Sequence, residues 1–73
     1  MRHDEIRTNV IYLTKIGAHR LPFRVDEIDE DYFDPKTRRF RVAYHCKNLA
    51  TDRKVVLFSP RRFVRRIIVN LGY

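Results

Sequence analysis

Hydrophobic and polar residues alternate most regularly in residues 38–47, RRFRVAYHCK. The apolar residues of one side are Phe40, Val42, Tyr44 and Cys46, and the residues of the other side are Arg39, Arg41, Ala43, His45 and Lys47. Alternation with a period of two over such a length is typical of a β-strand that buries one face. The sequence therefore predicts a strand whose inner face joins the core and whose outer face is almost wholly basic.

Two neighbouring stretches extend this pattern into an antiparallel sheet. Residues 53–58, RKVVLF, predict a strand that the short loop NLATD joins to the first one as a hairpin. Residues 21–29, LPFRVDEID, predict a further strand, and the out-of-phase Ile28 indicates a β-bulge near residues 26–27. The segment 30–37, EDYFDPKT, carries Asp-Pro and Lys-Thr, which are typical of a turn. Together these segments predict a three-stranded meander.

Residues 9–16, NVIYLTKI, fit two elements. A strand would place Val10, Tyr12 and Ile16 on one face, and the β-branched residues favour it. A helix that begins at Asp4 is the alternative that the pattern leaves open. We expect the strand.

Residues 59–71 also have two interpretations. In a helix, Ser59 would be the N-cap and Pro60 the first helical residue. The basic face opposite the apolar stripe would then consist of Arg61, Arg62, Arg65 and Arg66. In a turn followed by a strand, these arginines would be divided between the turn and the two strand faces. The β-branched residues 67–69 disfavour the helix, whereas residues 63–69 alternate poorly as a strand because Arg65 interrupts the apolar face. The sequence leaves both interpretations open.

The segment VLFSPRRFV, residues 56–64, resembles the end of SH3-like barrels: a strand ending in an aromatic residue, then Pro, two residues, an aromatic residue and Val. LPFRVDEID resembles the second strand of small barrels of the KOW and Tudor type. The resemblance covers residues 9–69 and implies a mainly β fold, a small SH3-like five-stranded antiparallel barrel. The chain lacks the KOW-type glycine and a full aromatic cage, so the family's ligands do not carry over. The alternative is an antiparallel β-meander packed by a C-terminal basic amphipathic helix at residues 60–71.

The length of 73 residues predicts one small basic domain, residues 1–73, with an ordered core at about residues 9–69. Hydrophobic residues make up 44% of the chain, which is enough for a compact core. The chain has one cysteine, so an internal disulfide is excluded. No apolar run approaches the ~20 residues of a membrane span, and the charged N-terminus has no apolar signal region. We therefore expect a cytoplasmic protein without membrane contact.

The net charge of +7 is distributed unevenly. Residues 1–37 hold six basic and eight acidic side chains, a net charge of −2, whereas residues 38–73 hold ten basic side chains and one acidic side chain, Asp52, a net charge of +9. Such asymmetry indicates a directed basic surface, whose commonest partners are polyanions.

The predicted nucleic-acid-binding residues combine the basic strand face, the start of its partner strand and the C-terminal arginines. They are Arg38, Arg39, Arg41, His45, Lys47, Arg53, Lys54, Arg61, Arg62, Arg65 and Arg66. Guanidinium groups match phosphate oxygens in a bidentate geometry. Tyr32 and Phe33 are candidates for stacking on bases, although for Phe33 we favour a place at one end of the core. The other aromatic residues expected in the core are Phe23, Phe40, Tyr44, Phe58 and Phe63.

The sequence does not predict an enzyme. His45 and Cys46 are adjacent in a strand, so they face opposite sides and cannot act as base and nucleophile. The histidines and the cysteine lack zinc-site spacing, and no glycine-rich phosphate loop exists. We expect no cofactor, no metal and no small-molecule substrate.

The predicted function is a non-catalytic module that binds DNA or RNA through the phosphate backbone, with little sequence specificity. The alternative is a small protein-interaction module or inhibitor that docks on an acidic protein or a nucleic-acid-processing complex.

Overall fold

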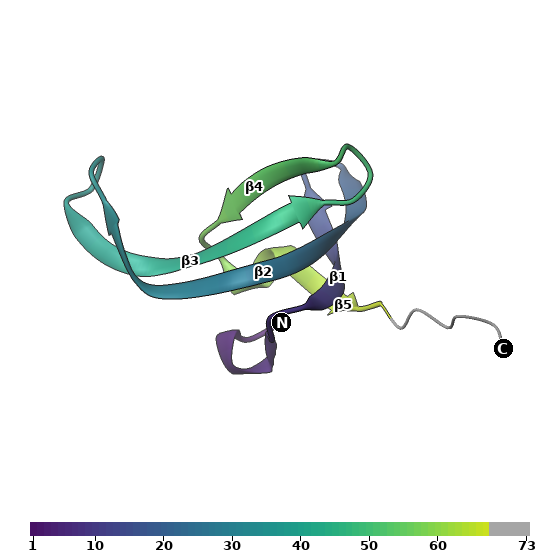
Figure 1. Cartoon of the computed structure of the whole chain (residues 1–73), viewed down its shortest axis with the longest axis horizontal. Helices are drawn as coiled ribbons and strands as arrows, with labels where there is room; N and C mark the ends of the chain where they lie inside the picture. Colours follow the sequence, from purple (N-terminus) through teal and green to yellow (C-terminus); the bar gives the residue numbers. More distant parts are fainter. Residues whose placement is uncertain (68–73) are drawn as a thin grey trace, which may run out of the picture.

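The computed structural model describes residues 1–67, which form five antiparallel strands and two short 3₁₀ turns (Figure 1). The strands are β1 (Val10–Ile16), β2 (His19–Asp34), β3 (Arg39–Asn48), β4 (Arg53–Leu57) and β5 (Phe63–Arg66), and the turns are η1 (His3–Glu5) and η2 (Pro60–Arg62). They form one sheet in the order β4-β3-β2-β1-β5. The predicted mainly β, antiparallel fold is confirmed, and no α-helix occurs in residues 1–67.

Two predictions about the N-terminal half are confirmed. Residues 10–16 form β1 rather than a helix, and β1 pairs with β2 over its whole length. The β2–β3 register shifts between Val25 and Glu27, which is the bulge that the out-of-phase Ile28 indicated. A second shift follows between Asp29 and Tyr32. These irregularities bend the long strand β2.

The alternative C-terminal helix is wrong for the residues that the structure describes. Ser59 does cap a turn, but η2 ends after one turn, and Phe63 begins β5, which pairs with β1. Strand geometry lets Phe63 reach the core, where its side chain is fully buried. Residues 68–71, the rest of the predicted helix, lie outside the described residues.

The core contains the predicted aromatic residues Phe23, Tyr44 and Phe63, each at most 1% exposed. The Phe63 ring packs edge-on against Tyr44 at 5.3 Å and against Tyr12 at 5.5 Å between centroids. The buried tyrosine hydroxyls bond to the N-terminal segment: the Arg7 backbone N–H donates to Tyr12 at 2.8 Å, and His3 Nδ1 lies 2.6 Å from Tyr44 Oη. The residues before β1 therefore cover one end of the core.

The hairpin of β2 and β3 is longer than predicted. Residues 30–34 were expected in the connection but continue β2, because Tyr32 and Phe33 pair across the hairpin with Arg41 and Phe40. The strand β4 covers only the other end of β3, Tyr44–Asn48. Residues 29–43 therefore project past the rest of the sheet (Figure 1), and we call them the arm.

In the part of the chain that the structure describes, no helix is long and apolar enough to cross a membrane.

Candidate nucleic-acid interface

Asp34 organises the turn at the end of the arm. Its Oδ1 accepts the Lys36 backbone N–H at 2.9 Å, and its backbone carbonyl accepts the Arg38 N–H at 2.8 Å. Its Oδ2 accepts Arg41 Nη1 at 3.0 Å. The backbone hydrogen bond from Lys36, followed by the bond from Arg41, lowers the pKa of the Asp34 carboxyl. The single acid near this turn is therefore ionised and already bonded.

This arrangement predicts the pH dependence of the turn. The pKa of Asp34 is lower in the folded protein than in the unfolded chain, where it is about 3.9. Its contribution to stability is therefore complete above about pH 4 and is lost as the pH falls through the lower folded value. In unfolding experiments between pH 2 and 6, we expect Asp34→Asn to reduce the loss of stability in acid. Asp31→Asn, on the same hairpin but exposed, serves as control, and equal curves for both variants would contradict the role of Asp34.

We call the turn at the end of the arm the tip. It carries three exposed cations that form no ion pair within the described residues: Lys36, Arg38 and Arg39. Arg38 also has a left-handed backbone, with φ of 56°. Within residues 1–67, the other non-glycine residues with positive φ are Asn9 and Asp52, which are of types that tolerate this conformation. Arginine is not stabilised by a left-handed backbone conformation, so the stability of the turn does not explain why an arginine occupies position 38.

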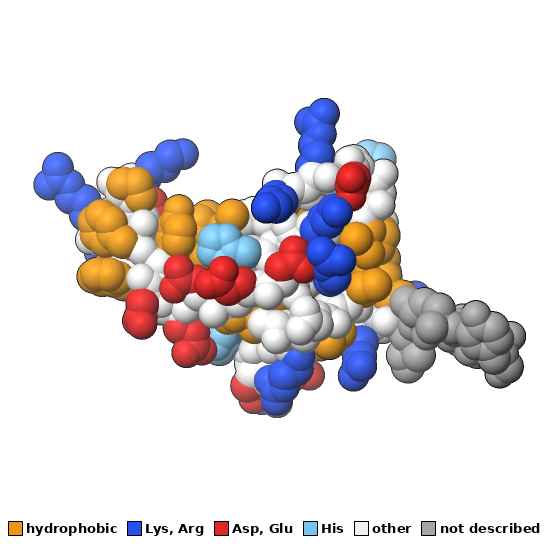
Figure 2. Space-filling view, in the orientation of Figure 1, with side chains coloured by type: hydrophobic (Ala, Val, Ile, Leu, Met, Phe, Trp, Pro, Cys, Tyr) orange, Lys and Arg blue, Asp and Glu red, His pale blue; other side chains and the backbone are white. Residues whose placement is uncertain are grey.

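Two phenylalanines lie on the arm beside these cations. Phe33 and Phe40 are directly opposite in the β2–β3 register, and their ring centroids are 5.4 Å apart. Phe33 is 50% exposed and Phe40 is 72% exposed. The expectation that both belong to the core is wrong, because this part of the hairpin extends beyond the strands that could cover it. Figure 2 shows hydrophobic side chains grouped over the arm, with Lys or Arg side chains projecting beside them.

The opposite face of the arm carries a second aromatic group, at the base of the arm. Tyr32 packs against Phe58 at 5.5 Å and against the His45 ring at 6.2 Å between centroids. The Arg41 guanidinium lies 4.1 Å from the Phe58 ring centroid. Tyr32 is therefore partly covered by neighbouring side chains, whereas Phe33 presents a free ring. Phe58, expected in the core, is only partly buried.

The basic face of β3 is not one continuous surface. Arg39 and Lys47 are separated by roughly 25 Å along the strand, at about 3.3 Å per residue. Between them Ala43 is fully buried, and β2 places Glu27 opposite His45. The prediction of an almost wholly basic face is therefore wrong, because the adjacent strand supplies acids.

The residues at the other end of β3 form a mixed-charge group. Lys47 pairs with Asp52 at 2.6 Å, and Arg24 pairs with Asp26 at 2.6 Å. Arg53 and Lys54, also exposed, begin β4 next to this group and form no ion pair within residues 1–67. Lys47, Arg53 and Lys54 therefore lie together at this end of β3, apart from the cations of the arm.

The C-terminal arginines form a third group. Arg61 and Arg62 of η2 share a hollow with Lys15 and Ser59, and the Arg62 guanidinium donates to the Lys15 carbonyl at 3.4 Å. Arg65 and Arg66 are consecutive and exposed in β5, so they project to opposite sides of the strand. The structure thus brings together only part of the predicted basic surface.

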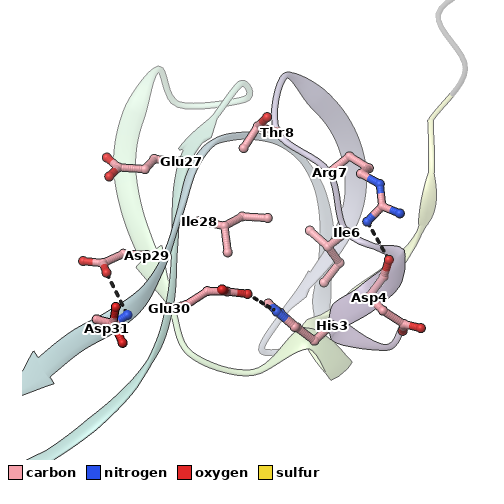
Figure 3. Close-up of a pocket in the computed structure, with 10 residues that line it drawn as sticks. All are labelled: His3, Asp4, Ile6, Arg7, Thr8, Glu27, Ile28, Asp29, Glu30 and Asp31. Atoms are coloured by element: carbon pink, nitrogen blue, oxygen red, sulfur yellow. Dashed lines mark hydrogen bonds and ion pairs between the residues drawn. The ribbon is translucent and has the colours of Figure 1, made fainter.

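Four acidic residues of β2, Glu27, Asp29, Glu30 and Asp31, lie beside the N-terminal segment (Figure 3). These residues and the N-terminal segment line a hollow in which Ile6 and Ile28 point inward from opposite walls. The Glu30 carboxylate lies 2.8 Å from His3 Nε2. Within residues 1–67, no three His, Cys, Asp or Glu side chains gather as a metal site. Asp26, Glu30 and Asp34 instead pair with basic or histidine side chains of the same chain.

Cys46 is buried in the core, away from His45. Burial raises the pKa of its thiol to about 12, so the group is protonated at neutral pH and is a poor nucleophile.

None of the family models, curated proteins and solved structures compared with the chain matches it.

Proposed function

We propose that this chain is a non-catalytic nucleic-acid-binding module of the SH3-like barrel type, which contacts phosphates with the cations of the arm. The proposal rests on the cations of the tip, which form no ion pair within the described residues. Lys36, Arg38 and Arg39 are exposed on a projecting hairpin, and the nearby carboxylate of Asp34 already accepts Arg41. Cations without internal partners are available to replace counterions on a polyanion.

The SH3-like assignment is supported by connectivity. The chain forms a meander of β2, β3 and β4, passes through the 3₁₀ turn η2 and returns to pair β5 with β1. This order agrees with the resemblance of VLFSPRRFV to the end of such barrels.

The proposed binding is weakly sequence-specific. The chain has three asparagines and no glutamine, so the bidentate reading of adenine has little support. Asn48 is buried and its side-chain oxygen accepts the Ala50 N–H at 3.0 Å. Affinity should therefore depend mainly on phosphate contacts and fall steeply with salt.

The test is fluorescence anisotropy with labelled single-stranded DNA, single-stranded RNA and duplex DNA between 50 and 300 mM salt, a range chosen to resolve the slope. The proposal requires binding whose logarithmic affinity falls linearly with the logarithm of the salt concentration. No binding to any of the three at low salt, together with a stoichiometric complex with an acidic protein, would instead establish the protein-interaction function.

Arg38→Asn separates stability from binding. Asparagine tolerates the left-handed backbone better than arginine, so we expect the variant to gain up to about 1 kcal/mol in the free energy of unfolding. The loss of one phosphate contact should weaken single-strand binding about fivefold at 0.1 M salt. Urea unfolding and anisotropy measure the two effects. A variant that is less stable and binds equally well would contradict both the strain and the contact.

A further inference from the structure

We propose that the Phe33–Phe40 pair is a stacking platform for unpaired bases, so that the ligand is single-stranded nucleic acid. The inference rests on the proposed function and specifies its ligand. It goes beyond phosphate contact, because cations alone do not distinguish a single strand from a duplex.

The Phe33–Phe40 pair is exposed on the surface of the arm. Phe33 and Phe40 are the two most exposed large hydrophobic side chains that the structure describes, at 50% and 72%. They lie together, with ring centroids 5.4 Å apart and ring planes inclined by 59°. Their partnership is fixed by the register of β2 and β3, which places them opposite each other next to the Asp34–Arg39 pair that closes the turn. Two adjacent rings, each exposed over half of its surface or more, form a surface on the hairpin that a flat apolar group can occupy.

Cationic side chains lie around the two rings. A hollow on the arm is lined by Phe40 together with Thr37, Arg39 and Arg41. Arg38 and Lys36 lie in the same turn, whose bonds to Asp34 fix the backbone that carries them. Aromatic rings beside cationic side chains are the combination that holds single strands, because bases stack on the rings while phosphates meet the cations. This charge distribution favours a nucleic acid over an uncharged apolar partner.

A ligand that stacks on the two rings must expose the faces of its bases. In a duplex, neighbouring base pairs cover the faces of each base, so a ring can stack only on an end or an unpaired position. The two phenylalanines lie on the arm, beyond the parts of β2 and β3 that pair with β1 and β4. Single-stranded DNA and RNA share the required chemistry, and the test compares them.

The experiment measures anisotropy with the full chain and the variant Phe33→Leu/Phe40→Leu, which keeps an apolar arm but removes the π faces. The matched control is Val56→Ala/Val64→Ala, which alters two exposed hydrophobic residues outside the arm. The probes are unstructured 12-nucleotide oligo-dT and oligo-U, a blunt DNA duplex of the same length and heparin, a polyanion without bases. Circular dichroism confirms that each variant is folded.

We expect the phenylalanine variant to lose about tenfold or more in affinity for the single strands, since stacking contributes strongly per base. Its affinities for the blunt duplex and heparin should change less than about twofold, as should all affinities of the control variant. A loss confined to oligo-dT or to oligo-U would identify that nucleic acid as the ligand.

Three results would overturn the inference. If the phenylalanine variant binds single strands as tightly as the original chain, or loses heparin binding equally, the rings do not stack on bases, and phosphate binding stands alone. If sedimentation shows a dimer that the variant abolishes, the rings are covered by a second copy. If the original chain binds none of the four probes, the proposed function itself is wrong.

Discussion

Phe63→Ala is expected to remove a large part of the free energy of unfolding. The Phe63 side chain is fully buried and contacts the rings of both Tyr12 and Tyr44. Truncation of a buried phenylalanine costs about 3–5 kcal/mol because it removes apolar contacts and leaves a cavity. A domain of this size has a total stability of only about 4–11 kcal/mol, at 0.05–0.15 kcal/mol per residue. Thermal unfolding followed by circular dichroism measures the effect.

The matched control is Val64→Ala, one residue further along β5 and partly exposed at 36%. We expect a change of less than about 0.5 kcal/mol, as for surface substitutions. If the Phe63 variant keeps a melting temperature within a few degrees of the original chain, β5 does not complete the core. That result would also remove the basis for choosing a strand over a helix at residues 63–66.

Arg38→Ala/Arg39→Ala is expected to cause the largest loss of binding. Both side chains are exposed on the arm and form no ion pair within the described residues. Each lost phosphate contact on a single strand lowers the salt slope by about 0.7, so the pair should lower it by about 1.4. At 0.1 M salt this corresponds to a loss of roughly 25-fold in affinity. The measurement is anisotropy with oligo-dT across a salt series.

Arg53→Ala/Lys54→Ala is the matched control for this prediction. It removes the same charge from two exposed residues of β4, at the opposite end of β3. If the arm makes the phosphate contacts, the control variant should lose markedly less affinity for oligo-dT than Arg38→Ala/Arg39→Ala. Equal losses from the two double variants would mean that net charge, and not the arm, determines affinity.

The strands of the sheet could be predicted from periodicity, but the exposure of the arm could not. Alternation correctly places Phe40, Tyr44 and Cys46 on one side of β3, yet Phe40 is exposed while the other two are buried. Periodicity indicates which face a residue is on, whereas burial depends on whether another strand reaches that face. Here β4 reaches only as far as Tyr44.

One signal in the sequence could have indicated the aromatic pair. Phe33 and Phe40 are equally distant from the turn residues 35–38, so an Asp34–Arg39 closing pair places them opposite each other. Because residues 30–37 were expected to form the connection, Phe33 was not placed in a strand, and its pairing with Phe40 was not predicted.

The predicted basic face failed for a related reason. The sequence around β3 has one nearby acid, Asp52, but the acids of β2 reach the same surface through strand pairing. The charges of residues that are neighbours in sequence therefore do not give the net charge of a sheet surface, because paired strands contribute residues from elsewhere in the chain. The bulge at residues 25–27 was predictable because it depends on local pattern. For residues 59–66 the local pattern fitted both a helix and a turn followed by a strand, and the choice depends on the pairing of β5 with β1.

The most direct test of the central claim, that the arm binds nucleic acid, is a titration of isotope-labelled protein with oligo-dT followed by NMR. We expect the amide and ring signals of residues 33–41 to shift most, with Phe33 and Phe40 ring protons moving upfield as bases stack over them. Signals of β4, including Arg53 and Lys54, should change little. Shifts concentrated in β4 or η2, with those of the arm unchanged, would contradict the account.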